Sequence, residues 1–295
     1  MKLGAIDIGT NAARLLIGEI AINDEGFSFV KKVSYTRVPL RLGMDVFEKG
    51  KISSKKKGDF IKTIKAFQLI ADVFNVKELR ACATSAMREA SNGKEVQKEI
   101  KKETGIDIEI IDGEEESRLV FSAFFLLEVD KNTPFIVIDV GGGSTEVSIF
   151  KDGFKVAASS FKIGTIRLLK DKVNKSVWSD INSWLDKNLD LKSKYRVFGT
   201  GGNINKVHKL LGKRDMQSIS FQELTNLYDQ ISPLSVEKRI KKFQLKEDRA
   251  DVIVPAISIY SGIMSKIKAK KLIVPKIGLA DGIIYGLYEK MNEKE

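Results

Sequence analysis

The chain has 295 residues, of which 43% are hydrophobic and 30% charged. This length and composition exclude a disordered chain and favour two domains. The single cysteine, Cys82, excludes an internal disulfide, and the single histidine, His208, leaves little material for a zinc or serine–histidine site.

The sequence contains no apolar run of membrane-spanning length, and residues 1–4 lead directly into a strand-like segment instead of a signal peptide. We therefore expect a cytoplasmic protein without a membrane partner. The 50 Lys and Arg residues exceed the 39 Asp and Glu residues, and the formal charge of +11 suits a polyanionic partner. Residues 1–126 carry 21 basic and 19 acidic groups, whereas residues 127–295 carry 29 and 20, so the excess lies in the second half.

The first predicted elements form a hairpin: a buried strand over 3–11 that ends in a glycine turn, and a returning strand over 13–20. A third strand is expected at 30–37, and apolar spacing predicts an amphipathic helix over 53–74. Strands at 79–84 and 106–111 and a helix over 94–103 come next. The acidic residues 114–116 then suit the first turn of a further helix.

The hairpin pattern recurs over 135–150, which indicates an internal duplication, and residues 195–204 place a third glycine turn between a strand and a helix. Helices are predicted at 249–267 and 278–290, with a strand at 271–275. We expect one domain over 1–126 and a second over 127–295, whose last helix packs back on the first.

Both hairpins carry an aspartate and a glycine turn directly after a buried strand. Glycine has no Cβ, so the backbone N–H groups of such a turn can approach a phosphate. Two hairpins that face each other would form a phosphate clamp, although either alone is also typical of an ordinary hairpin turn. The predicted phosphate-binding residues are Gly9, Thr10, Asn11, Gly141, Gly142, Gly143, Ser144, Thr145, Gly199, Gly201 and Gly202.

Residues 7–11, 139–146 and 199–202 resemble the two phosphate motifs and the adenosine motif of the actin, Hsp70 and sugar-kinase superfamily. Residues 41–43, 83–90, 113–119 and 249–252 resemble the exopolyphosphatase and guanosine pentaphosphate phosphohydrolase family, and the match covers nearly the whole chain. This resemblance implies an α/β fold of two actin-like (ribonuclease H-like) domains, with mixed sheets flanked by helices and an interdomain cleft. It also implies a homodimer.

The resemblance implies roles for individual residues. Glu116 matches the second Glu of the family's Glu-Glu-Ala-Arg motif and is the expected general base. Arg88 and Arg249 are expected to neutralise the phosphoryl group. Without the resemblance, a solvated acidic helix start and ordinary surface arginines explain these residues. The expected ligands of Mg²⁺ or Mn²⁺ are Asp139, Glu146 and Asp7.

The expected activity is that of an exopolyphosphatase, which releases orthophosphate from the end of inorganic polyphosphate. Guanosine pentaphosphate and other nucleoside polyphosphates stay open as substrates. One reason is that Ala280 stands at the arginine of the family's Gly-Leu-Arg-Glu-Gly motif. A second is that residues 11–14 read Asn-Ala-Ala-Arg, whereas many relatives have Asn-Ser after the first loop, so a hydroxyl is lost and the charge of Arg14 is gained. A third is that long relatives continue into a further helical region. A small-molecule phosphotransferase and an actin-like ATP-binding structural protein are the remaining alternatives.

Basic runs occur at 55–57, 238–242 and 266–271. The simplest interpretation is solvated helix faces. The alternative is that some of these residues line the exit from the cleft and hold a long polyphosphate by multiple weak contacts. No recognisable nucleic-acid module accompanies them, so a nucleic-acid partner is not expected.

Overall fold

The computed structural model describes residues 1–293 except 25, 27, 125–132 and 191–192. Contacts divide the chain into two compact units, the first comprising Met1–Val129 with Ile277–Glu295 and the second Asp130–Lys276. The boundary predicted at 126/127 lies outside the described residues. The C-terminal helix α13 (Leu279–Asn292) contacts helix α5 and strand β1, so this segment, which the sequence-based division assigns to 127–295, belongs to the first unit.

The first unit is built on a five-stranded mixed sheet of order β3-β2-β1-β4-β5. Strand β1 pairs antiparallel with β2 and parallel with β4, and all six of its residues are buried, as expected for a central strand. The strands are β1 (Leu3–Ile8), β2 (Ala13–Ile22), β3 (Ser28–Val38), β4 (Glu78–Ala83) and β5 (Ile108–Ile110).

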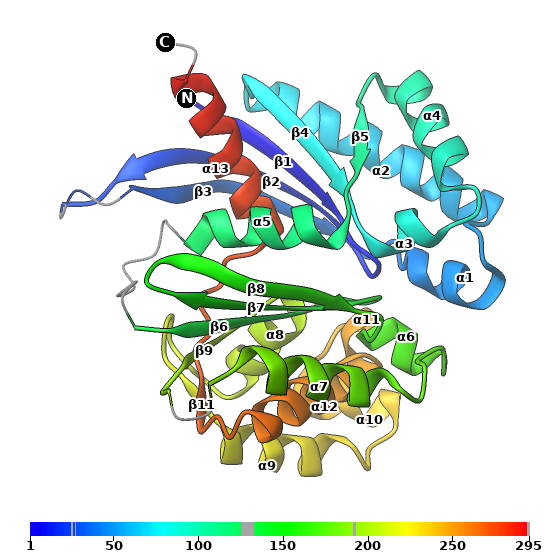
Figure 1. Ribbon diagram of the computed structural model, residues 1–295. Coiled ribbons are helices and arrows are strands. Elements are labelled where there is room, and N and C mark those ends of the chain that lie inside the picture. Colours follow the sequence, from blue (N-terminus) through cyan, green and yellow to red (C-terminus); the bar gives the residue numbers. More distant parts are fainter. Residues whose placement is uncertain (25, 27, 125–132, 191–192, 294–295) are drawn as a thin grey trace. The chain divides into compact units, whose positions relative to one another are not determined.

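Helices flank this sheet on both faces: α5 and α13 lie together on one, and α2 and α4 lie on the other (Figure 1). The helices that precede α13 in this unit are α1 (Leu42–Lys49), α2 (Ser54–Val73), α3 (Ser85–Glu89), α4 (Gly93–Thr104) and α5 (Gly113–Phe124). Helix α1 is absent from the sequence-based prediction.

The second unit contains a four-stranded mixed sheet of order β8-β7-β6-β9 and a two-stranded sheet, β10-β11. Only the pairing of β6 with β9 is parallel in the larger sheet. The strands are β6 (Phe135–Val140), β7 (Thr145–Lys151), β8 (Phe154–Phe161), β9 (Arg196–Thr200), β10 (Ile219–Ser220) and β11 (Lys271–Leu272).

Helix α12 is the central helix of the second unit. Its residues Ile253, Ile257, Tyr260 and Met264 follow a helical period and are fully buried, and the helix contacts α6, α8, α9 and β6. The helices of this unit are α6 (Thr165–Leu169), α7 (Val177–Asn188), α8 (Gly202–Leu210), α9 (Phe221–Ile231), α10 (Val236–Phe243), α11 (Glu247–Ala250) and α12 (Ile253–Lys266).

The expected α/β class, with two mixed sheets flanked by helices, is confirmed. The prediction misses β8, α6 and α7 between 151 and 194, and it also misses β10, α9 and α10 between 211 and 249. Strand β8 is a half-exposed edge strand, and α6 is too short for a helical period to be visible. None of the described helices is long and apolar enough to cross a membrane.

Candidate active site

The first predicted phosphate turn joins β1 to β2. The Gly9 N–H donates to the Ala12 carbonyl at 3.0 Å and closes the turn. Two carbonyls of this turn accept hydrogen bonds from the start of α1. The Gly43 N–H donates to the Thr10 carbonyl at 3.0 Å, and the Arg41 N–H donates to the Asn11 carbonyl at 2.9 Å. In a trans peptide unit the C=O and the next N–H point in opposite directions. The backbone N–H groups of Asn11 and Ala12, which share peptide units with these carbonyls, therefore point away from α1.

Asp7, at the end of β1, is directly opposite Arg14 of β2 in the antiparallel register, and their side chains form an ion pair of 2.5 Å. Both groups are largely screened from water, with 9% of the Asp7 side chain and 20% of the Arg14 side chain exposed. The carboxylate of Asp7 is therefore already neutralised by a cation of the same hairpin. A metal ion at this carboxylate would have to compete with Arg14.

Glu116 and Arg88 are neighbours in the first unit. Glu116 lies in the first turn of α5, and its Oε2 is 4.0 Å from a guanidinium nitrogen of Arg88 on α3. The same nitrogen donates a short hydrogen bond to the carbonyl of Ile111, just before α5, and so ties α3 to the strand end that leads into this helix. The Glu116 side chain is 15% exposed. A carboxylate held beside an arginine fits a group that handles a proton next to a bound anion.

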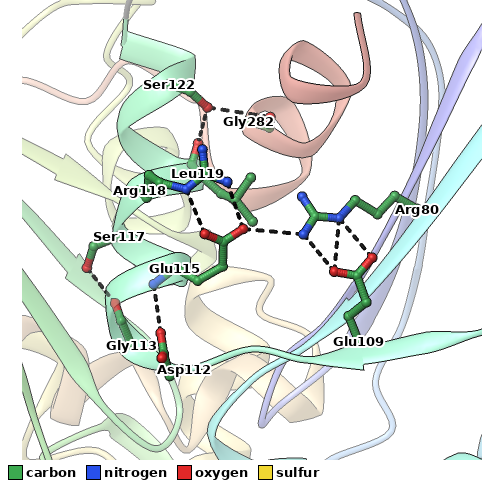
Figure 2. Close-up of polar contacts among 10 residues, drawn as sticks. All are labelled: Arg80, Glu109, Asp112, Gly113, Glu115, Ser117, Arg118, Leu119, Ser122 and Gly282. Carbon is green, nitrogen blue, oxygen red and sulfur yellow. Dashed lines mark hydrogen bonds and ion pairs between the residues drawn. The ribbon is translucent and has the colours of Figure 1, made fainter. Parts of the chain in front are cut away.

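Glu115, the residue before Glu116, has a different environment (Figure 2). It accepts hydrogen bonds from Arg118 at 2.6 and 2.8 Å and from Arg80 at 3.3 Å. Arg80 also binds Glu109 of β5. Hydrogen bonding from Arg118, followed by that from Arg80, lowers the pKa of Glu115, so this carboxylate stays ionised and anchors α5 to the sheet. The acidic run therefore divides into a structural Glu115 and a Glu116 beside Arg88.

The second predicted phosphate turn joins β6 to β7 and is held by segment 164–167. The N–H of Thr165 donates to the Gly141 carbonyl at 3.0 Å, and the N–H of Ile166 donates to that of Gly142 at 2.8 Å. The Nε of Arg167 donates to the Gly143 carbonyl at 2.7 Å. Three successive carbonyls thus point toward α6, so the N–H groups of residues 142, 143 and 144 point away from it. Successive N–H groups directed to one side form an anion-binding nest.

Gly164 and Arg167 are absent from the sequence-based prediction. A Cβ at Gly164 would lie 2.5 Å from the carbonyl carbon of Gly142 and 2.6 Å from its oxygen, so only glycine permits this close approach. Arg167 is buried, with 7% of its surface exposed. The only available signal was the glycine at 164 itself, because the sequence-based prediction contains no strand before it and nothing in the sequence indicates which turn it contacts.

The third glycine turn follows β9 and lies beside Asp139. Gly201 has a φ of 98°, and a Cβ there would lie 2.7 Å from the Asp139 carboxylate. At Gly202 a Cβ would lie 2.5 Å from the guanidinium of Arg249, which also donates to the Asn203 side chain at 2.6 Å. The second unit thus brings together Asp139, both glycine turns and Arg249.

Tyr260 fixes the position where β6 and β9 diverge. Its hydroxyl donates to the Thr200 carbonyl at 2.5 Å and accepts from the Val140 N–H at 3.3 Å. Burial raises the pKa of Tyr260 well above its usual range, so the hydroxyl keeps its proton and remains a donor. These bonds replace the strand ladder, which ends at the pair Asp139–Thr200.

Asp139 and Glu146 are the candidate metal ligands of the second unit. They are directly opposite in the antiparallel register of β6 and β7, which places both side chains on one face of the sheet. Glu146 is 5% exposed and accepts a hydrogen bond from Ser160 at 2.7 Å. No group of three or more acidic, histidine or cysteine side chains suited to a metal occurs among the described residues. Two carboxylates fit Mg²⁺, which commonly uses one or two together with water and substrate phosphates.

The site residues therefore form two groups, one in each unit: a turn with Glu116 and Arg88 in the first, and two turns with Asp139, Glu146 and Arg249 in the second. A model of the Ppx/GppA phosphatase family matches residues 20–291. The chain belongs to this family. The expectation of a phosphoanhydride hydrolase is thereby confirmed at the level of the family.

Individual relatives agree with this assignment. The chain is 27% identical to exopolyphosphatase 1 of Mycobacterium bovis over 96% of its own length and 87% of the relative's. It is 26% identical to the crystal structure of an Aquifex aeolicus Ppx/GppA family member, with a TM-score of 0.77 and 99% of each chain covered. The crystal structure of an exopolyphosphatase from Cytophaga hutchinsonii, at 24% identity and a TM-score of 0.82 over 98% of each chain, supports the fold alone.

Proposed function

We propose that the protein is an Mg²⁺-dependent exopolyphosphatase that removes the terminal phosphate of inorganic polyphosphate as orthophosphate. The observation that carries this proposal is the second glycine turn, whose three carbonyls are held by segment 164–167 and whose N–H groups form a nest beside Asp139 and Glu146. The relative named exopolyphosphatase 1, at 27% identity, supports the choice of substrate.

In the proposed reaction a water oxygen bonds to the terminal phosphorus and the bond from this phosphorus to the bridging oxygen breaks. The bridging oxygen remains with the shortened chain, and Glu116 takes a proton from the attacking water. In the second unit the backbone N–H groups of the glycine turn and Arg249 would bind phosphate oxygens. In the first unit the turn at Gly9 would do the same, and Arg88 would offset negative charge beside Glu116. As is usual for phosphoryl transfer, the protein acts mainly by positioning the reactants and stabilising charge, with little covalent chemistry of its own.

Asp139 and Glu146 would hold the metal ion, which when bound neutralises charge on the phosphate oxygens. Asp7 is a weaker candidate for this role, because Arg14 already occupies its carboxylate. Mn²⁺ suits the same oxygen donors.

The test is phosphate release from tripolyphosphate, long-chain polyphosphate, guanosine pentaphosphate and ATP in the presence of Mg²⁺, with the unmodified protein and with Glu116→Gln. We expect kcat to fall about 10²–10⁴-fold, the usual contribution of a general base. Glu114→Gln is the matched control, since Glu114 lies in the same helical turn but is exposed. No release from any substrate would refute the hydrolase, and equal rates for the two variants would refute the role of Glu116. Release from guanosine pentaphosphate alone would favour that substrate instead.

A further inference from the structure

The net positive charge of the protein lies in the second unit. Residues 130–276 contain 27 basic and 15 acidic side chains, a net charge of +12, whereas the rest of the chain contains 23 and 24, a net charge of −1. Some of these cations form ion pairs with nearby carboxylates. Lys213 binds Glu223 at 2.5 Å, and Lys266 binds Asp186 at 2.7 Å. A cation without such a carboxylate is therefore more informative than the total charge.

Lys206 is such a cation. It lies on α8, one helical turn after Gly202, the residue against which the Arg249 guanidinium packs. Lys209 follows three residues later on the same side of the helix. Lys206 is half-buried, and its ammonium group makes no ion pair with any carboxylate of the described part of the chain.

The surroundings of Lys206 disfavour its charge. Burial lowers the pKa of Lys206, and the neighbouring charges of Lys209 and Arg249 lower it further, with no acidic group acting in the opposite direction. The partly dehydrated ammonium group of Lys206 and its two cationic neighbours, Lys209 and Arg249, repel one another. A bound anion would remove this repulsion, and phosphate oxygens would accept hydrogen bonds from the ammonium and guanidinium groups.

We infer that Lys206, Lys209 and Arg249 form a second phosphate subsite, which holds a phosphate of a linear polyphosphate chain beyond the three that tripolyphosphate supplies. The subsite begins at the third glycine turn, where Gly201 contacts Asp139 and Gly202 contacts Arg249. From Gly202 to Lys209 it runs about 10 Å along α8, given a rise of 1.5 Å per residue. A chain whose end is bound beside Asp139 thus meets further cations in sequence.

The same surface is poorly suited to a nucleoside. Recognition of a base uses apolar or aromatic surface, but α8 and α11 contain no aromatic side chain apart from His208. The His208 ring is fully buried, and its Nε2 lies 2.8 Å from the Gln217 carbonyl. The inference rests on the proposed function and deepens it, because it assigns residues that hold the polyphosphate chain beyond its terminal phosphate.

The test compares steady-state kinetics on long-chain polyphosphate and on tripolyphosphate for Lys206→Gln, Lys206→Arg and Lys241→Gln. Lys241, an exposed lysine on α10 of the same unit, controls for the loss of one positive charge. We expect Lys206→Gln to raise KM for the long chain about tenfold or more, the scale of a hydrogen bond to a charged group, with kcat and the KM for tripolyphosphate little changed. Lys206→Arg should restore most of the affinity, and Lys206→Gln should make KM less sensitive to salt.

The other outcomes separate the two proposals. If the unmodified protein releases phosphate but Lys206→Gln behaves like Lys241→Gln, the subsite is wrong and the proposed function stands. An equal fall in kcat on both substrates would indicate a structural role and would also overturn the subsite. If the unmodified protein releases nothing from either polyphosphate, the proposed function fails and the inference fails with it.

Discussion

The close packing of α13 on α5 leads to a prediction that the structure makes quantitative. A Cβ at Gly282 would lie 1.7 Å from the Leu119 carbonyl oxygen and 2.5 Å from its carbon. The two helices would have to separate by roughly 1.5 Å or more to reach an ordinary contact distance. Alanine in a helix interior gains about 0.5–1 kcal/mol over glycine, whereas overpacking of this kind costs about 1–3 kcal/mol. We expect Gly282→Ala to destabilise the protein by about 1–2 kcal/mol.

Gly286→Ala is the matched control, because this glycine lies one turn further along α13 and its Cβ would meet only a Leu119 side-chain carbon, at 4.0 Å. That variant should keep or increase the stability. Urea unfolding followed by circular dichroism gives the two free energies. Leu119 and Gly282 lie close together (Figure 2). Because Leu119 is one turn from Glu116 on α5, displacement of this helix in Gly282→Ala should also lower phosphate release. Equal stability of the two variants would refute the close helix contact.

Two further predictions concern the second glycine turn and the start of α5. Gly164→Ala should weaken the binding of tripolyphosphate, because the added Cβ would displace the backbone of the turn. The control is Gly58→Ala, at a helix position where an added Cβ would have no atom within 4 Å, and this variant should leave the binding measured by calorimetry unchanged. Because the pKa of Glu115 is lowered in the folded protein, its contribution to stability is present above its ordinary pKa of about 4.3 and is lost as the pH falls below that value. Glu115→Gln should therefore reduce the fall in unfolding free energy below about pH 4.5, a change that Glu114→Gln should not reproduce.

The sequence was sufficient to predict the hairpins, because a buried strand, a glycine turn and a second strand form a local pattern. The pair Asp7–Arg14 could also have been predicted, since a turn closed between Gly9 and Ala12 places residues 7 and 14 opposite each other. The distinction between Glu115 and Glu116 could not be predicted, because it depends on Arg80 and Arg88, which precede the two acids by 27 residues or more.

Non-local packing accounts for most of what the sequence did not indicate. Arg167 is one of many arginines, and only the folded chain reveals that it binds the Gly143 carbonyl. The helical pattern of α13 is visible in the sequence, but its position depends on Leu119, more than 150 residues earlier. Such contacts leave no periodic pattern in the sequence, so residue spacing cannot predict them.

The two units use one structural arrangement with different charges. In each, two antiparallel strands enclose a glycine turn, a third strand follows, and the segment at the start of the next helix, α1 or α6, binds the carbonyls of the turn. Both arrangements direct backbone N–H groups away from that helix and can receive an anion. The residue opposite the aspartate differs: Arg14 opposes Asp7, whereas Glu146 opposes Asp139. Within the repeated hairpin, only the second pair retains the negative charge needed to attract a divalent cation, so the duplication supplies two candidate phosphate turns but one candidate metal site.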